Sequence, residues 1–420
     1  MSSKIISMPS QSSRQVDPAC LSGKRIAVIV FSYFLTDPRV YRETSALAAA
    51  GAEVEVLCLR KSDEPLKERR NNINITRAPV KKSRAGKLAY VAQYATFTAF
   101  AFGWLTRRVL GKRFDLVHVH NMPDFLVFAA LPAKLAGAKV VLDLHDPMPE
   151  VFLAKYDLSP NHLLLRTLRL IEKLSIRFAD LVLTPNTAFR ELFASRSGPE
   201  EKIRIVMNSP LEETFPLTVP DDAPRRGEED RFTLMYHGTL VERHGLHTAI
   251  NAFASLAGTF PGLRFYLFGA ETEYLTGTIL PLIERLGLQG DVKYFGEQSQ
   301  KSIATAIRAC DLGLIPNLKS AFTEINFPTR IFEYLALGRP VLVPETPGIQ
   351  DYFGSDNMLF FAWGGNEEEE LATKIQWVFE HPAEVRALVE KGQEVYRANA
   401  WPVQKETFLK AVSGLVKRKK

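Results

Sequence analysis

The sequence predicts an α/β protein built from two Rossmann-like, doubly wound domains that face each other across a cleft. Three features of the chain lead to this prediction. Apolar runs of strand length alternate with helical segments in both halves, as in βαβ units with a parallel sheet. A proline-rich stretch divides the two series. Many of the strands end in glycine or polar residues, and ligands bind at that edge of a parallel sheet.

The first half contains six apolar runs of strand length. They cover residues 26–31, 54–59, 116–120, 139–144, 181–185 and 202–208. Helical segments are expected between them at residues 39–50, 124–137 and 162–178. Because consecutive parallel strands need a crossover connection, this order predicts one sheet with helices on its faces.

A linker separates this half from a second series. It is marked by Pro210, Pro216, Pro220, Pro224 and the charged run 225–230. Strands of the second half are expected at residues 232–238, 265–269, 292–296, 312–316 and 340–344. We therefore divide the chain into a disordered lead-in at 1–22, a first domain at 23–208, the linker at 209–230, a second domain at 231–398, and a C-terminal helix with a basic tail at 399–420 that crosses back to the first domain.

Composition narrows the class of protein. With 420 residues, 46% hydrophobic and 24% charged, the chain is globular and too long for one ordinary domain. Three scattered cysteines, Cys20, Cys58 and Cys310, argue against a disulfide scaffold and favour a reducing compartment. A formal charge of +6 fits acidic lipid, nucleotide substrates or plain solubility, and does not choose between them. Residues 1–22 are rich in serine and lack the apolar core of a secretory signal.

Residues 88–110 raise the question of membrane contact. The segment is apolar and nearly long enough to span a bilayer, although Gln93 and several threonines interrupt it. Basic residues flank it: Lys81, Lys82, Arg84, Lys87, Arg107, Arg108, Lys112 and Arg113. A span here would split a domain, because the segment lies between two strands of one expected sheet. A buried crossover helix and a helix that touches an anionic bilayer both stay open.

Polar residues and glycines gather at the strand ends. In the first half the strand ends carry His118, His120, Asp143, His145 and Asp146. In the second half the corresponding turns carry Gly238, Gly269 and Gly296, and Arg243 precedes the next helix. Small residues at such turns let a ligand approach the backbone closely. This layout predicts a reaction surface on the first domain that faces a nucleotide-like site on the second.

One further helix points to a ligand. Pro328 and Thr329 mark its start and Gly338 its end, and Glu333 is a lone acid among apolar residues. Burying an unpaired acid is costly, so Glu333 needs a partner. The amides of a helix start suit phosphate oxygens, and a nearby carboxylate suits the hydroxyls of a ribose. The alternative is a salt bridge between Glu333 and Arg330 on a half-exposed helix.

Taken in order, these motifs resemble the retaining glycosyltransferases of family 4, whose two-domain architecture is called GT-B. The resemblance covers about residues 24–415. It is carried by Asp37-Pro38-Arg39-Val40, Gly51-Ala52-Glu53-Val54, residues 115–121, Asp143-Leu144-His145-Asp146 with Pro149-Glu150, Ala179-Asp180, Asn208, residues 236–240 with Arg243 and Gly245, residues 309–312 and the Glu333 helix. Each motif is weak by itself, whereas their shared order and spacing is a strong signal.

The chain also departs from the pattern of the family. The family signature has two glutamates seven residues apart, and that spacing from Glu333 falls on Ile325, one place after Glu324. The resemblance therefore does not assign a glutamate to the donor sugar. The lysine usual before the helix glycine is His244 here, with Arg243 adjacent. The first strand turn, residues 32–34, lacks the usual glycine pair.

The resemblance implies a retaining, metal-independent glycosyltransferase that needs no cofactor besides its donor. The implied donor is a nucleoside-diphosphate sugar, and a UDP-sugar or a GDP-sugar is the leading candidate. The basic residues around 81–113 favour a lipid-linked or polysaccharide acceptor in cell-surface glycan biosynthesis. We accordingly expect a cytoplasmic protein with peripheral contact at the inner face of an anionic membrane, and no nucleic-acid partner. The base, sugar, acceptor and linkage lie beyond the sequence.

The resemblance also assigns roles to residues. The implied catalytic residues are His120, Arg243 and Asp146; the implied donor-binding residues are Gly238, Thr239, Arg243, Gly269, Phe295, Thr329, Arg330 and Glu333; His145 and Asp146 face the acceptor. Glu333 resembles the ribose ligand, and His120 the histidine at the donor sugar. Arg243 is favoured for the diphosphate because its fork can bind two oxygens. His118 is expected to be a core histidine bonded to backbone, and Asp146 is alternatively a helix cap beside Pro147.

Two other functions stay open from the residues themselves. His118, His120, Asp143, His145 and Asp146 have the ligand chemistry of a metal-dependent hydrolase. A protein that binds or epimerises a nucleotide sugar also fits the architecture. A dinucleotide oxidoreductase is disfavoured, because no strand is followed by the G-x-G-x-x-G pattern.

Overall fold

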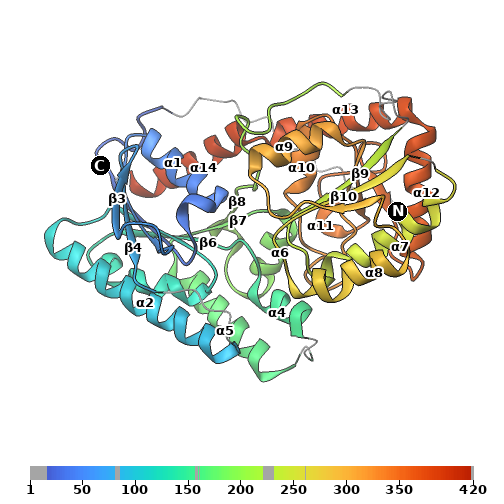
Figure 1. The fold of residues 1–420 in the computed structure, drawn as a ribbon. Helices are drawn as coiled ribbons and strands as arrows, with labels where there is room; N and C mark the ends of the chain where they lie inside the picture. The colour runs from blue at the N-terminus through green and yellow to red at the C-terminus, as the bar shows by residue number, and fades with distance from the viewer. Residues whose placement is uncertain are drawn as a thin grey trace.

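The computed structural model describes residues 17–80, 86–156, 159, 161–220, 231–260 and 262–417. Most of the expected lead-in, the basic residues Lys81, Lys82 and Arg84, the linker run 221–230 and the last three residues lie outside this part of the chain. The described chain forms two α/β domains, each built on its own sheet (Figure 1). The predicted fold class is confirmed.

The first domain contains an eight-stranded sheet in the order β3-β4-β2-β1-β5-β6-β7-β8. The strands are β1 (Arg25–Val30), β2 (Glu53–Leu59), β3 (Lys67–Arg70), β4 (Ile73–Ala78), β5 (Leu116–His120), β6 (Lys139–Asp143), β7 (Leu181–Thr184) and β8 (Ile203–Ile205). All pairs are parallel except β3 with β4. The β3–β4 hairpin was absent from the sequence prediction, and β8 is shorter than the expected strand at 202–208.

Alternate residues of each strand face opposite sides of this sheet, and both sides are buried. On β1, Ala27 and Ile29 enter one core while Ile26 and Val28 enter the other. The first core lies under α2 (Gly86–Gly111) and the second under α1 (Pro38–Ala49). The remaining helical segments of the domain are η1 (Phe34–Thr36), η2 (Asp124–Ala130), α3 (Leu131–Leu135), α4 (Met148–Tyr156), α5 (Leu163–Phe178), α6 (Thr187–Arg196) and η3 (Glu200–Lys202).

The second domain contains a six-stranded, fully parallel sheet in the order β11-β10-β9-β12-β13-β14. Its strands are β9 (Phe232–His237), β10 (Leu263–Phe268), β11 (Val292–Tyr294), β12 (Leu312–Leu314), β13 (Val341–Pro344) and β14 (Leu359–Phe361), the last of which was not predicted. Its helical segments are η4 (Glu242–His244), α7 (Leu246–Ala257), the π-helical turn η5 (Leu275–Ile279), α8 (Leu280–Arg285), α9 (Gln300–Ala309), α10 (Arg330–Ala336), α11 (Pro347–Gln350), α12 (Glu367–Glu380) and α13 (Pro382–Asn399).

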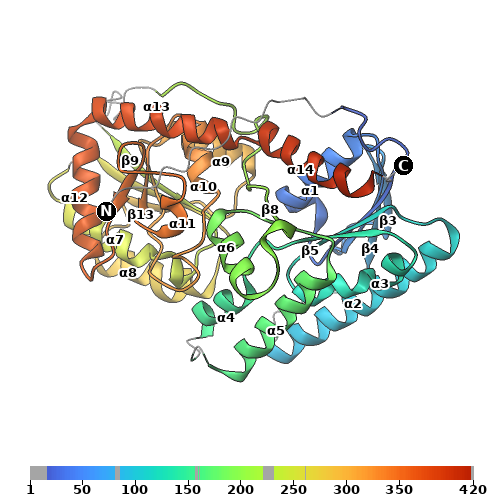
Figure 2. The same ribbon diagram turned by 180° about the vertical axis from the view of Figure 1, so that it is seen from behind.

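The chain passes between the domains twice. It crosses first after β8 and returns after α13, so that α14 (Trp401–Val416) lies on the first domain beside α1 (Figures 1 and 2). Trp401, Phe408 and Val412 of α14 are buried in the core that contains β1 and α1. The guanidinium of Arg42 lies over the Trp401 ring, 4.5 Å from its centroid. The last helix of the chain is therefore part of the first domain's core.

The helix predicted around residues 88–110 is α2, and it is a crossover helix between β4 and β5. Phe97, Ala101 and Leu105 are buried against the sheet, whereas Val91 and Leu110 face outward with 62% and 83% of their surface exposed. Among the described residues, no helix is both long and apolar enough to cross a membrane. One face of α2 is thus core and the other is an exposed apolar surface.

Candidate active site

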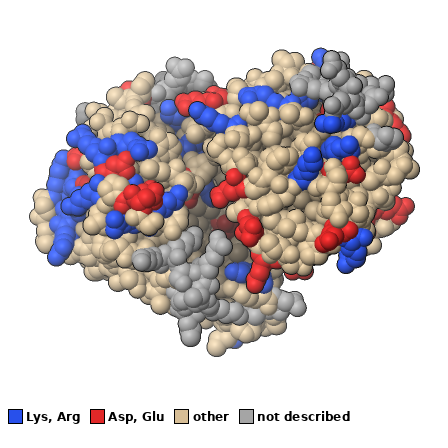
Figure 3. All heavy atoms as spheres, viewed as in Figure 1, with Lys and Arg blue, Asp and Glu red and all other residues tan. Residues whose placement is uncertain are grey.

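A pocket of about 230 Å³ lies where α1, the linker and the second domain meet. Figure 3 shows the molecule hollowed between its two halves at this place. The pocket is lined by Asp37, Pro38, Arg39, Arg42, Asn208, Pro210, Leu211, Phe215, Gln300, Thr329 and Glu333. The N-terminus of α1 follows the carboxyl end of β1, so the cleft is at the edge where ligands bind in doubly wound sheets.

On the second domain, the turns after β9 and β10 each require a glycine. Gly238 has a φ of 129°, a conformation that side chains disfavour, and a Cβ there would lie 3.2 Å from Nη1 of Arg330. At Gly269, which follows β10, a Cβ would lie 2.1 Å from the carbonyl oxygen of Gly238. The two turns are therefore packed backbone to backbone, with the Arg330 side chain beside Gly238.

Arg243 follows this turn in η4 and is one of the arginines near the cleft with an unpartnered Nε, as Arg39 is on the first domain. Its side chain is half-buried, and its Nε has no hydrogen-bond partner among the described residues. Burial lowers the pKa of Arg243, and the charge of Asp146 from the first domain opposes that shift. The structure thus brings Arg243 and Asp146 together across the cleft. The α4 amides donate no hydrogen bond to the Asp146 side chain, so the described chain gives no sign of the helix-cap alternative.

His244 supports the turn. Its Nδ1 lies 2.7 Å from the carbonyl oxygen of Thr239, and the hydroxyl of Tyr236 donates to the same oxygen at 2.8 Å. Burial, with a smaller contribution from Arg330, lowers the pKa of His244 to about 3, so the imidazole is neutral at neutral pH. His244 therefore positions Thr239, and Arg243 supplies the positive charge.

Glu333 projects from α10 into the pocket. Its Oε2 lies 3.4 Å from Nε2 of His237 at the end of β9. Arg330 does not pair with Glu333; its Nη1 donates to the carbonyl oxygen of His237 at 2.6 Å, and its guanidinium lies over the Tyr236 ring. Burial raises the pKa of Glu333 to about 7. The surface salt-bridge interpretation is therefore wrong, and Glu333 is a desolvated carboxyl group at the cleft.

Thr329 joins α10 to the other domain. Its hydroxyl oxygen accepts a hydrogen bond from the amide of Asn208 at 3.1 Å, and Arg42 donates to the Asn208 carbonyl at 2.7 Å. Arg42 also donates to the carbonyl of Ser209. This chain of polar contacts ties α1, the linker and α10 together at one wall of the pocket. Thr329 is thus engaged in a contact between domains rather than capping α10 through its side chain.

Phe295 offers an aromatic face at the end of β11. It is 43% exposed and stacks on Phe268, with ring centroids 5.0 Å apart and planes at 12°. Gly296 closes this strand end, where its carbonyl accepts from the Gly269 amide at 3.0 Å. Aromatic rings held in this way suit a planar ligand group such as a base.

Across the cleft, His120 and His145 share one buried acid. Nδ1 of His120 lies 3.3 Å from Oδ2 of Asp143, and Nδ1 of His145 lies 3.2 Å from Oδ1. Burial and the charge of Arg39 lower the pKa of His145, so this imidazole is neutral. His118 lies deeper, and neither of its ring nitrogens has a hydrogen-bond partner in the described chain. The expected backbone bond of His118 is therefore wrong.

The position of the missing signature glutamate is buried in a domain contact. Ile325 packs against the first domain's core, and its carbonyl accepts from Asn186 at 3.3 Å. Glu324 pairs with Lys319 and is partly exposed. Neither residue lines the pocket, so this segment contributes no carboxylate to it.

Of the eleven residues that line the pocket, only Thr329 and Glu333 were predicted as site residues. The other nine, among them Arg39, Asn208 and Gln300, were missed. Arg39 was part of a recognised motif, and the start of α1 at Pro38 could have placed it at the carboxyl end of β1. Its Nε is buried without a hydrogen-bond partner among the described residues. Gln300 begins α9, and no pattern in the sequence signalled that this helix start faces α1.

The architecture and the cleft together define a GT-B glycosyltransferase. Residues 36–209 match the family model described as glycosyl transferase 4-like domain, and residues 220–395 match glycosyl transferases group 1. Together the two models cover most of the chain, and the protein belongs to this glycosyltransferase family. It is accordingly a sugar-transferring enzyme, which sets aside the hydrolase and the purely binding or epimerising alternatives.

Solved structures share the fold at low identity. Sucrose-phosphate synthase from Thermosynechococcus elongatus is 17% identical, with a TM-score of 0.76, over 93% of this chain and 99% of that one. The Anabaena protein Alr3699/HepE in complex with UDP is 20% identical, with a TM-score of 0.67, over 93% and 100%. A UDP-forming α,α-trehalose-phosphate synthase from Burkholderia xenovorans is 16% identical, with a TM-score of 0.71, over 94% and 100%. No curated protein sequence matches the chain.

Proposed function

We propose that the enzyme transfers a sugar with retention from a nucleoside-diphosphate sugar to a lipid-linked or polysaccharide acceptor in cell-surface glycan biosynthesis. The observation that carries this proposal is Glu333, a desolvated carboxyl group in the interdomain pocket, together with the glycine turn after β9 and Arg243 of η4 on the same domain. Backbone amides and an arginine suit a diphosphate, a carboxylate suits the hydroxyls of a ribose, and an aromatic ring suits the face of a base. UDP is the first candidate nucleotide, since a neighbour of the same fold was solved with UDP.

Each part of the donor has a matching group. Arg243 and the amides of the Gly238 turn suit the diphosphate. Glu333 suits the ribose hydroxyls, and Nε2 of His237 lies 3.4 Å from its Oε2. Phe295 suits the face of the base. Because Arg330 is engaged with His237, we assign it to shaping the turn rather than to binding phosphate directly.

The reaction follows from where charge develops. The bond between the anomeric carbon and the β-phosphate oxygen breaks, which leaves negative charge on the diphosphate beside Arg243. An acceptor oxygen bonds to the anomeric carbon on the same face, and its proton passes to the departing phosphate oxygen. Preorganised positive charge is often the largest catalytic contribution. His120 faces the donor sugar in this scheme, His145 and Asp146 face the acceptor, and the transfer uses no catalytic metal.

The acceptor proposal is supported by an exposed apolar surface on the first domain. Helices α2 and α5 both contact η2 and lie along the same side of that domain (Figures 1 and 2). On α5, Leu163, Leu170 and Leu174 are 73%, 56% and 46% exposed. Val91, Phe102 and Leu110 add to this surface from α2. Exposed apolar side chains among basic ones suit an anionic bilayer at the inner membrane face.

Membrane contact can be tested by flotation with vesicles that contain anionic phospholipid. We expect the wild-type enzyme to float with them and the double variant Leu170→Glu, Leu174→Glu to float about tenfold less, because two partly inserted leucines are replaced by charges that anionic lipid repels. Leu286→Glu, at a 38% exposed leucine of the second domain, is the matched control and should float like wild type. Equal flotation of the double variant would exclude α5 as the contact.

The proposed reaction is tested by donor binding and by product structure. A thermal-shift screen of UDP, GDP, ADP and their sugars should show one nucleotide series that raises the melting temperature by several degrees, since saturation to 100 times Kd contributes about 2.7 kcal/mol. With that donor and a glycan acceptor, NMR should show the product with the donor's anomeric configuration. Added Mg²⁺ or Mn²⁺ should not raise the rate. An inverted product, or free UDP with no glycosylated product, would overturn the proposal.

A further inference from the structure

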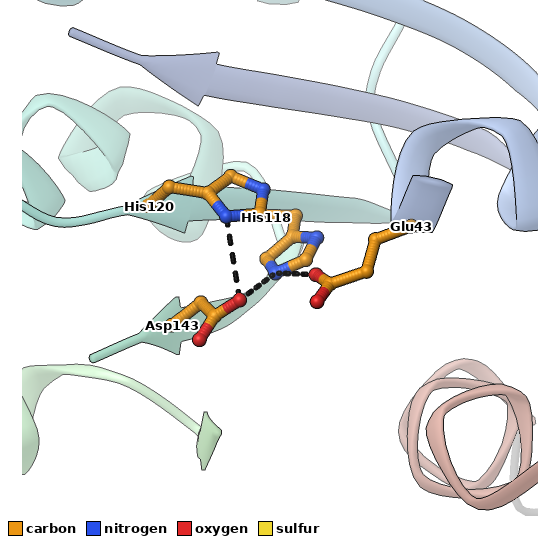
Figure 4. Close-up of side chains that lie close together, drawn as sticks. All are labelled: Glu43, His118, His120 and Asp143. Carbon is orange, nitrogen blue, oxygen red and sulfur yellow. Dashed lines mark ion pairs between the residues drawn. The ribbon is translucent and has the colours of Figure 1, made fainter. Parts of the chain in front are cut away.

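Four buried side chains of the first domain form a compact group behind the cleft. They are Glu43 of α1, His118 and His120 of β5, and Asp143 of β6 (Figure 4). His118 and His120 are two residues apart on a strand, and so project from the same face of the sheet as Asp143 on the neighbouring strand. Glu43 closes the group from the helix above. Each residue is 0–4% exposed.

The spacing of the facing atoms is that of ligands around one cation. Nε2 of His118 lies 3.7 Å from Oε2 of Glu43 and 3.9 Å from Oδ2 of Asp143, and Nδ1 of His120 lies 3.3 Å from the same Oδ2. The first two distances are too long for hydrogen bonds. Four ligands at about 2.0–2.1 Å from a tetrahedral Zn²⁺ are roughly 3.4 Å apart. All four candidate ligand atoms lie within 4.8 Å of one another.

The hydrogen bonding of these atoms is incomplete. Oε2 of Glu43 and both ring nitrogens of His118 have no hydrogen-bond partner in the described chain, although buried polar atoms almost always have one. Among the described residues, no arginine or lysine forms an ion pair with Glu43 or Asp143. Arg42 is adjacent in sequence, but its guanidinium donates to Asn208 and Ser209. Two carboxyl groups are thus enclosed with two imidazoles and no cation bonded to them.

We propose that Glu43, His118, His120 and Asp143 bind one divalent transition-metal cation, with Zn²⁺ the best match. Two imidazoles and two carboxylates are zinc ligands, and they disfavour the oxygen-only sites of Mg²⁺ and Ca²⁺. Four protein ligands leave no open position, so the site is structural. It joins α1 to β5 and β6, and it leaves Nε2 of His120 outside the ligand set.

The test begins with untagged enzyme, because a histidine tag binds the same metals. After incubation with Zn²⁺ and exhaustive desalting, elemental analysis should find about one equivalent per chain. Removing the metal with a strong chelator should lower the melting temperature by several degrees, and Zn²⁺ but not Mg²⁺ should restore it. Substituted Co²⁺ should give the visible absorption of four-coordinate cobalt. A metal content near zero with no response to Zn²⁺ would overturn the site and favour a proton shared between Glu43 and Asp143.

The ligand set is tested with one isosteric variant and a matched control. Glu43→Gln should bind Zn²⁺ at least tenfold more weakly and lose the cobalt spectrum. Glu172→Gln changes another fully buried acid, one that is bonded to Arg196 and Ser197, and should keep the metal even though it is destabilised. If both variants retain one equivalent and the same spectrum, the metal lies elsewhere. Circular dichroism of each variant shows whether it is folded. Donor binding by each variant shows whether the nucleotide site is intact, independently of the metal site.

Discussion

Replacing Arg243 by alanine should lower kcat about 100- to 1000-fold, the largest effect that we expect from one substitution. The side chain lies in η4, after the Gly238 turn, with an Nε that has no hydrogen-bond partner in the described chain, and the charge of Asp146 acts on it. Its charge is therefore available to the diphosphate as the sugar leaves. Removing one preorganised donor from developing negative charge typically costs two to three orders of magnitude.

Steady-state kinetics with the donor found by the thermal-shift screen will check this result. Arg243→Lys should recover part of the rate, because lysine keeps the charge and loses the two-pronged geometry. Arg264→Ala is the control: Arg264 pairs with Asp291 at 2.7 Å near the start of β10, far along the strand from the cleft, and its loss should leave kcat within about twofold. A normal kcat in Arg243→Ala would remove Arg243 from the diphosphate site.

Replacing Glu333 by glutamine should weaken donor binding about 100-fold, with a smaller effect on kcat once the enzyme is saturated. A carboxylate that accepts from ribose hydroxyls makes charge-assisted hydrogen bonds, each worth about 1.5–3 kcal/mol. The amide can accept only with one oxygen and carries no charge. Calorimetric titration with UDP-glucose measures the change. Glu324→Gln removes the neighbouring acid that lies outside the pocket, and should bind the donor like wild type.

The pH dependence of binding gives a second readout for Glu333. Burial raises its pKa from an ordinary 4.5 to about 7. Between pH 4.5 and about 7 the ligand-free folded state keeps the proton on Glu333, whereas the unfolded state has lost it. The contribution of Glu333 to folding stability is therefore full below pH 4.5 and is lost as the pH rises through 7. Ribose hydroxyls favour the ionised form, so wild-type affinity for UDP-glucose should rise between pH 6 and 8. A diphosphate diester does not titrate there. Glu333→Gln should show a flat profile; a parallel rise would assign the titration to another group.

The fold was predictable where strands are buried on both faces. β1, β5 and β6 are continuous apolar or histidine-containing runs, and the expected ranges match the observed ones closely. β3 has the sequence Lys67-Glu-Arg-Arg70 and no apolar residue, so hydrophobic patterning could not reveal this edge strand. The turn between β3 and β4 is indicated only weakly by the sequence. Asn71 and Asn72 both have positive φ, at 47° and 64°, as in two-residue hairpin turns.

The sequence could identify candidate site residues that lie at or just after the carboxyl ends of predicted strands. Thr329 and Glu333, both predicted as site residues, line the observed pocket, whereas Gly238 and Arg243 lie in the turn after β9 and in η4 and are not among its lining residues. The contacts between domains could not be read in the same way. Arg39 and Gln300 face one pocket because α1 and α9 are brought together by the relative placement of two sheets, which no local pattern in either segment encodes. The roles of the predicted residues stay predictions until the variants are measured.

The position of α14 has a consequence for the order in which the protein is made. A ribosome releases β1, α1 and the rest of the first sheet long before residues 401–416 exist, at about 5–20 residues per second. Throughout synthesis of the second domain, the first one waits without Trp401 and Phe408 in its core. The nascent first domain is therefore an incomplete folding unit with apolar surface open to chaperones, and α14 completes its core only after the second domain has been translated.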